Sequence, residues 1–197
     1  EPLLYKRIAE LTEITKQSGI DVSFTTNGTI LPKDFLERGL PNISWIKASI
    51  NAGTEETYHK IHQGKKGDFY KAVKNLKTMV NYKKEHNLEV VLGAQSMLLP
   101  ENVDEMDELA RVCRDEIRLN YLVIKPYSQH MFSLTHKYEG VDYTKYAHYE
   151  KKFTEMSSDT FKVIFRGNTM KKYIYGGDNR YKKCYATPNL WAYIMAD

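Results

Sequence analysis

The sequence predicts an α/β fold in which parallel strands alternate with helices. Short stretches rich in β-branched and aromatic residues recur along the 197 residues, and longer segments with apolar positions at helical spacing separate them. Strands joined through helices in this way form right-handed crossovers, which make neighbouring strands parallel. A chain of this length, 42% hydrophobic and 27% charged, has enough apolar residues for one substantial core, so we expect one main compact unit.

The first half of the chain contains three expected helices and two expected strands. Residues 3–19 place Leu4, Ile8, Leu11 and Ile14 at helical spacing and end at Gly19, a common residue just past a helix end. A strand over 20–28 ends at an Asn-Gly turn, and a short helix over 31–40 has a proline near its first turn. A strand over 44–53 and a helix over 67–87 follow, and the apolar face of that helix comprises Phe69, Val73, Leu76 and Val80.

The second half continues the alternation. We expect strands over 88–98, 120–128 and 161–167, with helices over 102–116 and 144–156 between them. Residues 168–190 are expected to leave the sheet as an irregular segment, and residues 191–197 to form a further strand.

Charge and cysteine content exclude several classes of protein. The net charge of +4 is spread along the chain, with lysines beside glutamates. The sequence has no basic stripe interleaved with aromatic residues, so we do not expect nucleic-acid binding. No apolar run is long enough to cross a bilayer, so we expect no membrane partner and a cytoplasmic location. Cys113 and Cys184 are too few for a disulfide framework and show no metal-ligand spacing within the chain.

Polar residues gather where the predicted strands end. Each one alone is an ordinary turn former, but ligands of parallel α/β folds bind at the carboxyl ends of the strands, so five polar ends on one rim favour a ligand site. The sequence has no histidine-carboxylate dyad, no phosphate-binding Gly-Lys-Ser/Thr loop and no nucleophile elbow, which argues against acid-base or nucleophilic catalysis at this rim. The rim residues are Glu1, Pro2, Thr25, Thr26, Asn27, Gly28, Ser49, Asn51, Gln95, Ser96, Lys125, Tyr127, Ser128 and Gln129.

Histidines give a weaker signal. His59 and His62 are three residues apart, which suits one helical face, but no third ligand accompanies them and we favour a surface pair over a metal site. His130 and His136 lie in the loop after the strand over 120–128, where a surface loop and a substrate contact are both open interpretations.

Taken in order, these segments resemble the core domain of the radical S-adenosylmethionine (radical SAM) superfamily. "EPLL" resembles the end of the family's Gly-Gly-Glu-Pro motif, and "FTTNGTIL" resembles its third-strand turn. "IKASINAGTEETYHKIHQG" and "GAQSMLLPENVDEMDELA" resemble the fourth strand and the fifth strand with its following helix. The resemblance covers nearly the whole chain and implies an incomplete (partial) TIM-type barrel of parallel strands with outer helices, the first strand missing and that edge open.

The resemblance also implies the chemistry. Members of this family cleave S-adenosylmethionine at a 4Fe-4S cluster to make a 5'-deoxyadenosyl radical, which abstracts hydrogen from a substrate, here a peptide or small molecule. The CxxxCxxC loop that binds the cluster is not in this sequence, so we expect the chain to be a fragment that is inactive alone, and a flavodoxin or ferredoxin to be the reductant of the full protein. The implied cofactor-binding residues are Glu1, Pro2, Thr26, Asn27, Ser49, Asn51 and Gln95, and the implied substrate-facing residues are Lys125, Tyr127, Gln129 and His130.

The end of the chain resembles the entry to an auxiliary-cluster extension called SPASM or twitch. In "CYATPNLWAYIMAD", Cys184 would then be a ligand of an auxiliary Fe-S cluster, and a lone free cysteine is an equally weighted alternative. Cys113 lies in a predicted helix and is interpreted as a small apolar residue. The implied organisation is a core over 1–167 and a truncated connection to the extension over 168–197.

Two alternatives remain open at this stage. One is a non-catalytic α/β domain that binds a nucleotide-like ligand or a protein partner, and the other is a TIM-like enzyme whose catalytic residues lie outside this chain. A CxxxCxxC motif shortly upstream of Glu1 distinguishes the radical enzyme from the binding domain.

Overall fold

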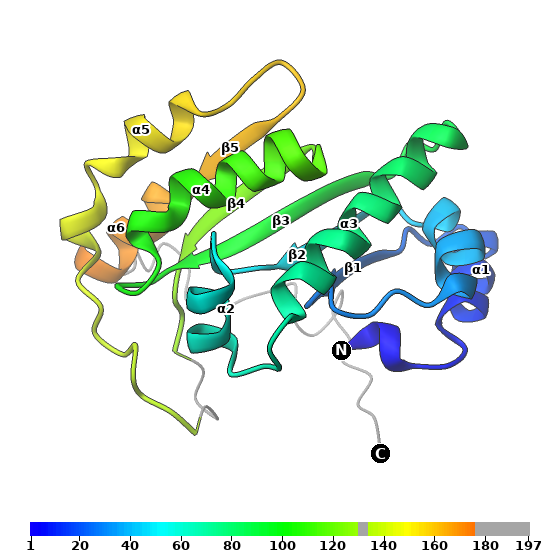
Figure 1. The fold of residues 1–197 in the computed structure, drawn as a ribbon, viewed down its shortest axis with the longest axis horizontal. Helices are drawn as coiled ribbons and strands as arrows, with labels where there is room; N and C mark the ends of the chain where they lie inside the picture. The colour runs from blue at the N-terminus through cyan, green and yellow to red at the C-terminus, as the bar shows by residue number, and fades with distance from the viewer. Residues whose placement is uncertain (130–133, 176–197) are drawn as a thin grey trace, which may run out of the picture.

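The structure, a computed structural model, describes residues 1–129 and 134–175 (Figure 1). Its centre is a five-stranded sheet in which every neighbouring pair is parallel and strand order follows sequence order. The strands are β1 (Ser23–Thr26), β2 (Trp45–Ser49), β3 (Val91–Leu98), β4 (Tyr121–Pro126) and β5 (Lys162–Phe165). The predicted α/β class with parallel strands is therefore confirmed, with each strand shorter than its predicted range.

The sheet is open. Within residues 1–129 and 134–175, β1 pairs only with β2 and β5 pairs only with β4, so the two outer strands do not meet to close a barrel. The open sheet agrees with the incomplete barrel expected from the sequence. Among the described residues, the backbone groups on the outer edge of β1 have no strand partner.

Within the described residues, six α-helices connect and cover the strands. Figure 1 shows α3 and α4 lying across one face of the sheet. The helices are α1 (Ile8–Gln17), α2 (Glu55–His62), α3 (Asp68–Glu85), α4 (Met106–Arg111), α5 (Tyr149–Glu155) and α6 (Gly167–Tyr175). Short 3-10 or π-helical turns lie at η1 (Pro2–Leu4), η2 (Phe35–Gly39), η3 (Leu40–Asn42), η4 (Val103–Glu105), η5 (Val112–Ile117) and η6 (Tyr143–Tyr146).

The core lies between the sheet and the helices. Ile46, Leu92 and Ile124 on the strands are buried in one cluster with Leu76 of α3 and Leu109 of α4. Because side chains alternate between the two faces of a strand, the intervening residues point to the other side, which we call the open face. Representative open-face residues are Trp45, Lys47, Ser49, Gln95, Lys125 and Ile164.

The first predicted helix is present as α1, but its apolar spacing only partly coincides with its buried face. Leu11 and Ile14 are each 52% exposed, while Ile8 is buried and Thr12 is almost fully buried beside it. Thr12 Oγ1 donates to the Ile8 carbonyl at 2.7 Å, and this bond satisfies the hydroxyl and lets a polar residue occupy the buried face.

Two further differences concern helices. The sequence analysis placed no element at α2, whose first turn is capped by the Thr54 hydroxyl. Residues 168–175 were expected to be irregular but belong to α6, so that prediction is wrong there, and the predicted boundary at 167/168 falls at the start of this helix. The predicted strand over 191–197 lies outside the described residues.

The other predicted helices are found over shorter or divided ranges: 31–40 contains η2, 102–116 contains η4, α4 and most of η5, and 144–156 contains α5 and most of η6. Phe69, Val73 and Leu76 are buried on α3 as expected, and Cys113 is fully buried, where desolvation raises the pKa of its thiol. No helix in the described part of the chain has both the length and the apolar character needed to span a bilayer.

Candidate functional site

Glu1 joins the start of the chain to the end of β1. Its Oε1 accepts hydrogen bonds from Thr26 Oγ1 at 2.7 Å and from the Leu3 amide at 3.2 Å, and its Oε2 accepts from the Asn27 amide at 2.7 Å. The structure thus brings together three residues that the sequence analysis assigned to cofactor binding.

The turn after β1 needs its glycine. Gly28 has φ +76°, and a Cβ at this position would lie 3.3 Å from the Ala48 side chain and 3.4 Å from that of Ala72. Asn27 Oδ1 accepts from both the amide and the hydroxyl of Thr29, at 2.9 and 2.7 Å, so the Asn27 NH₂ is the part of this side chain left to face a ligand.

Pro2 takes a structural position. It occupies the first turn of η1, and its carbonyl accepts from the Tyr5 amide at 3.1 Å. The ring has no hydrogen-bonding group, so any contact of Pro2 with a cofactor would be made through its backbone or by apolar packing.

Ser49 and Gln95 form the second polar pair of the rim. They are direct neighbours in the register of β2 and β3, and Gln95 Nε2 donates to Ser49 Oγ at 2.7 Å. The Gln95 carbonyl also accepts from the Ile50 amide at 3.1 Å, which continues the ladder past the end of β2.

Asn51 is held in a left-handed conformation, with φ 57°, and is almost fully buried. Its Oδ1 accepts from the Met97 amide at 2.8 Å, and its carbonyl accepts from Asn102 Nδ2 at 2.8 Å. Asn102, itself fully buried, also donates to the Met97 carbonyl and accepts from the Leu99 amide, both at 2.8 Å. These bonds fix the ends of β2 and β3 relative to one another, and the sequence analysis did not include Asn102 among the site residues.

Glu105 supports the loop between β2 and α2. Its carboxylate accepts from the amides of Gly53 and Thr54 at 3.1 and 3.2 Å, and from the hydroxyls of Thr54 and Thr57 at 2.9 and 2.5 Å. A Cβ at Gly53 would lie 2.7 Å from the Glu105 carbonyl, so the close approach of this loop requires glycine.

His62 lies at the rim and is not a surface residue paired with His59. Its Nε2 is 2.8 Å from the Ile50 carbonyl and 3.3 Å from Asn51 Nδ2, and its ring stacks on Tyr58 with 4.2 Å between centroids. Because a carbonyl only accepts, Nε2 carries a hydrogen. Burial lowers the pKa of His62, and the bond to Ile50 partly opposes this effect. Within residues 1–129 and 134–175, no three His, Cys, Asp or Glu residues are grouped as a metal site.

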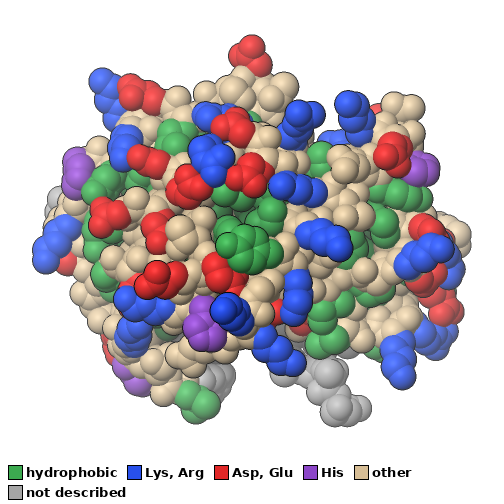
Figure 2. Space-filling model, in the orientation of Figure 1, with side chains coloured by type: hydrophobic (Ala, Val, Ile, Leu, Met, Phe, Trp, Pro, Cys, Tyr) green, Lys and Arg blue, Asp and Glu red, His purple; other side chains and the backbone are tan. Residues whose placement is uncertain are grey.

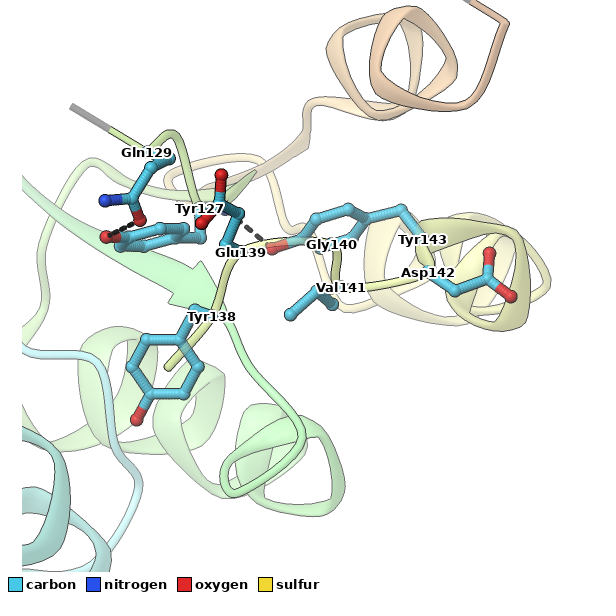
Figure 3. Close-up of a pocket in the computed structure, with 8 residues that line it drawn as sticks. All are labelled: Tyr127, Gln129, Tyr138, Glu139, Gly140, Val141, Asp142 and Tyr143. Atoms are coloured by element: carbon cyan, nitrogen blue, oxygen red, sulfur yellow. Dashed lines mark hydrogen bonds between the residues drawn. The ribbon is translucent and has the colours of Figure 1, made fainter. Parts of the chain in front are cut away.

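The predicted substrate-facing residues separate into two places. Lys125 is half-buried on the open face, whereas Tyr127 and Gln129 line a cavity of about 350 Å³ beside residues 138–143 (Figure 3). Tyr127 Oη donates to Gln129 Oε1 at 2.8 Å, and Gln129 Nε2 donates to the Thr135 carbonyl at 3.1 Å. His130 and Cys184 lie outside the described residues.

The sequence analysis missed two further cations of the open face. Lys47 lies in the middle of β2, and Arg166 follows β5 directly. The available signal for Lys47 was its place between the apolar residues Ile46 and Ala48 of the predicted strand, at a position that alternation directs away from the core.

Comparison with known proteins identifies the family. The radical SAM superfamily model matches residues 1–113 of the 197, and no curated protein matches the chain. The fold is similar to that of Streptococcus suis SuiB, with a TM-score of 0.63 and 14% identity over 93% of this chain and 42% of that chain. SuiB bound to S-adenosylmethionine gives a TM-score of 0.59 and 15% identity over 84% of this chain and 37% of that chain.

The chain therefore spans less than half the length of these two similar structures. The structural similarity shows a shared fold, a partial TIM-type barrel, and at such low identity it shows no more than the fold. The family model adds a sequence match over more than half of this chain. The chain belongs to the radical SAM superfamily.

Proposed function

We propose that this chain forms the S-adenosylmethionine-binding part of a radical SAM enzyme that acts on a peptide or small-molecule substrate. The observation that carries the proposal is the set of linked polar groups at three neighbouring strand ends, inside the segment that the family model matches. Bound to a 4Fe-4S cluster and given one electron by a reductant, the cofactor would supply radical abstraction of a hydrogen atom from the substrate, with methionine as the leaving group.

The rim residues fit the polar groups of this cofactor. Glu1, held by Thr26 and Asn27, offers carboxylate oxygens suited to the cofactor's amino group. Ser49 and Gln95 offer a hydroxyl and an amide oxygen suited to ribose hydroxyls, and the Asn51 NH₂ is suited to a carboxylate or ribose oxygen. These residues bind and orient, and none of them acts as an acid or base in the proposal.

The cluster ligands must come from outside these 197 residues. A 4Fe-4S cluster of this type needs three thiolates, and the sequence has two cysteines. Cys113 is fully buried in a helix, where its pKa is raised, so it is unsuited to the task. The chain alone is accordingly proposed to be inactive, and a SPASM or twitch extension carrying Cys184 to be part of the longer protein.

The test uses the full-length protein, reconstituted anaerobically with iron and sulfide. Iron content and the visible spectrum report the cluster, calorimetry reports S-adenosylmethionine binding, and mass spectrometry reports 5'-deoxyadenosine after reduction with dithionite or flavodoxin. Gln95→Ala is expected to weaken cofactor binding roughly tenfold, because a buried amide that contacts Ser49 and the ligand is removed.

Gln17→Ala is the matched control, since Gln17 is exposed on α1, and it should leave binding and product unchanged. A full-length protein that binds no iron, or that binds cofactor equally well with and without Gln95, would overturn the proposal. The first result would favour a non-catalytic binding domain instead.

A further inference from the structure

Among the described residues, the open face of the sheet carries positive charges that form no ion pair with an acid. None of the five strands contains an aspartate or glutamate, yet Lys47 and Lys125 lie within β2 and β4, and Arg166 follows β5. Neither lysine nor this arginine forms an ion pair with any residue of the described ranges 1–129 and 134–175. The opposite, helix-covered side differs, because cations and acids lie side by side across it (Figure 2).

The register of the sheet brings Lys125 and Arg166 together. Ile124 of β4 pairs with Phe165 of β5, and the Arg166 amide donates to the Ile124 carbonyl at 2.8 Å. Lys125 and Arg166, the residues that follow this pair, are therefore neighbours on adjacent strands. Alternation directs both side chains to the open face, about 5 Å apart at the backbone. Lys47 lies on the same face two strands from Lys125, with its Nζ 5.1 Å from the Trp45 ring centroid.

This arrangement is unfavourable without a ligand. Burial lowers the pKa of the Lys125 ammonium, and repulsion from Lys47 and Arg166 lowers it further. Lys162, at the other end of β5, is not among the charges that act on Lys125. An anion between the side chains of Lys125 and Arg166 would reduce this repulsion and give each cation an oppositely charged neighbour.

We propose that Lys125 and Arg166, supported by Lys47, bind an anionic group, a carboxylate or phosphate, of the substrate. This inference rests on the proposed function, because it takes the open face as the place where substrate meets cofactor. The position favours the substrate over the cofactor's own carboxylate. The proposed cofactor residues end β1, β2 and β3, whereas Lys125 and Arg166 belong to β4 and β5.

The test measures anion binding separately from radical chemistry. Full-length protein is titrated by calorimetry with glutarate and with inorganic pyrophosphate at constant ionic strength, and S-adenosylmethionine is titrated in parallel. At least one anion should bind, and Lys125→Met and Arg166→Met should each weaken it roughly tenfold, while Lys47→Met weakens it roughly threefold. S-adenosylmethionine affinity should stay within about twofold in the Lys125 and Arg166 variants.

Two controls make the result specific. Lys162→Met removes the same charge from the same face, about 13 Å along β5 from Arg166, and should weaken anion binding by less than about twofold. Lys125→Arg keeps the charge and should retain binding, which separates loss of charge from loss of folding.

Either of two outcomes overturns the proposal. One is that neither anion binds to the wild-type protein. The other is that Lys125→Met weakens S-adenosylmethionine binding as much as Gln95→Ala does, which would assign these cations to the cofactor. A protein that binds the anions but not S-adenosylmethionine would instead contradict the proposed function alone, so the two failures are distinguishable.

Discussion

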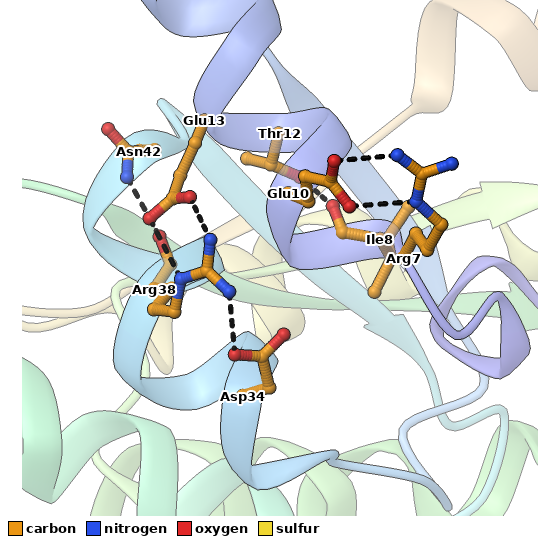
Figure 4. Close-up of polar contacts among 8 residues, drawn as sticks. All are labelled: Arg7, Ile8, Glu10, Thr12, Glu13, Asp34, Arg38 and Asn42. Carbon is orange, nitrogen blue, oxygen red and sulfur yellow. Dashed lines mark hydrogen bonds and ion pairs between the residues drawn. The ribbon is translucent and has the colours of Figure 1, made fainter.

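Two polar networks in this protein differ in both charge and surroundings. The buried network joins the ends of β2 and β3 through Asn51 and Asn102, which are neutral and almost fully enclosed. The exposed network joins α1 to η2 through the Arg38 guanidinium, which contacts Glu13 and Asp34 (Figure 4). Water replaces lost partners in the exposed network but cannot reach the buried one, so the two should respond very differently to mutation.

The largest effect is expected from Asn102→Ala. The change leaves the Leu99 amide and the carbonyls of Asn51 and Met97 without this partner, in a place closed to water. Stability should fall by about 3 kcal/mol, and S-adenosylmethionine affinity should fall with it because Asn51 loses its support. Urea unfolding measures the first effect and calorimetry on the full-length protein measures the second.

Asn81→Ala is the control, since Asn81 is exposed on α3, and it should change stability by less than about 0.5 kcal/mol. If both asparagine variants lost similar stability, the contrast between buried and exposed amides would not hold for this protein.

A smaller effect is expected from the ionisation of His62. Its pKa in the folded protein lies below the ordinary value of 6.5, because burial disfavours the charged ring. The unfolded chain therefore binds more protons near this pH, and stability increases with pH there. The contribution of neutral His62 is fully present above pH 6.5 and is lost as the pH falls towards the folded-state pKa.

Comparison of His62→Gln with wild type from pH 5 to 7.5 isolates this contribution. The difference in unfolding free energy should be largest above pH 6.5 and shrink at lower pH. A pH-independent difference for His62→Gln would mean that the ring acts only through packing on Tyr58.

The sequence predicted elements best where one strong period covered a long segment. The α3 stripe was found because Phe69, Val73 and Leu76 recur over 18 helical residues. In α1 the same spacing was misleading, since Leu11 and Ile14 face outward and Thr12, whose hydroxyl donates to the Ile8 carbonyl, lies on the buried face. Helix α2 was missed because "EETYHKIH" has few apolar residues to show a period.

The site was predicted in part for a similar reason. Strand ends of a parallel sheet meet at one edge, so Ser49 and Gln95 could be placed together from strand positions alone. His62 could not, because its place depends on the left-handed turn at Asn51 that returns the chain over the end of β2. Lys47 and Arg166 needed the strand register, which fixes what lies beside Lys125.

The smallest effect is expected from Arg38→Met, and it tests the exposed half of the comparison. The guanidinium bridges Glu13 of α1 and Asp34 before η2, and it is about half exposed on the surface. Solvent and salt screen such pairs, so the urea midpoint should fall slightly at 20 mM salt and not measurably at 500 mM salt. A large, salt-independent loss would show that this bridge carries the packing of α1 on η2, and position in the fold would then no longer separate the two networks.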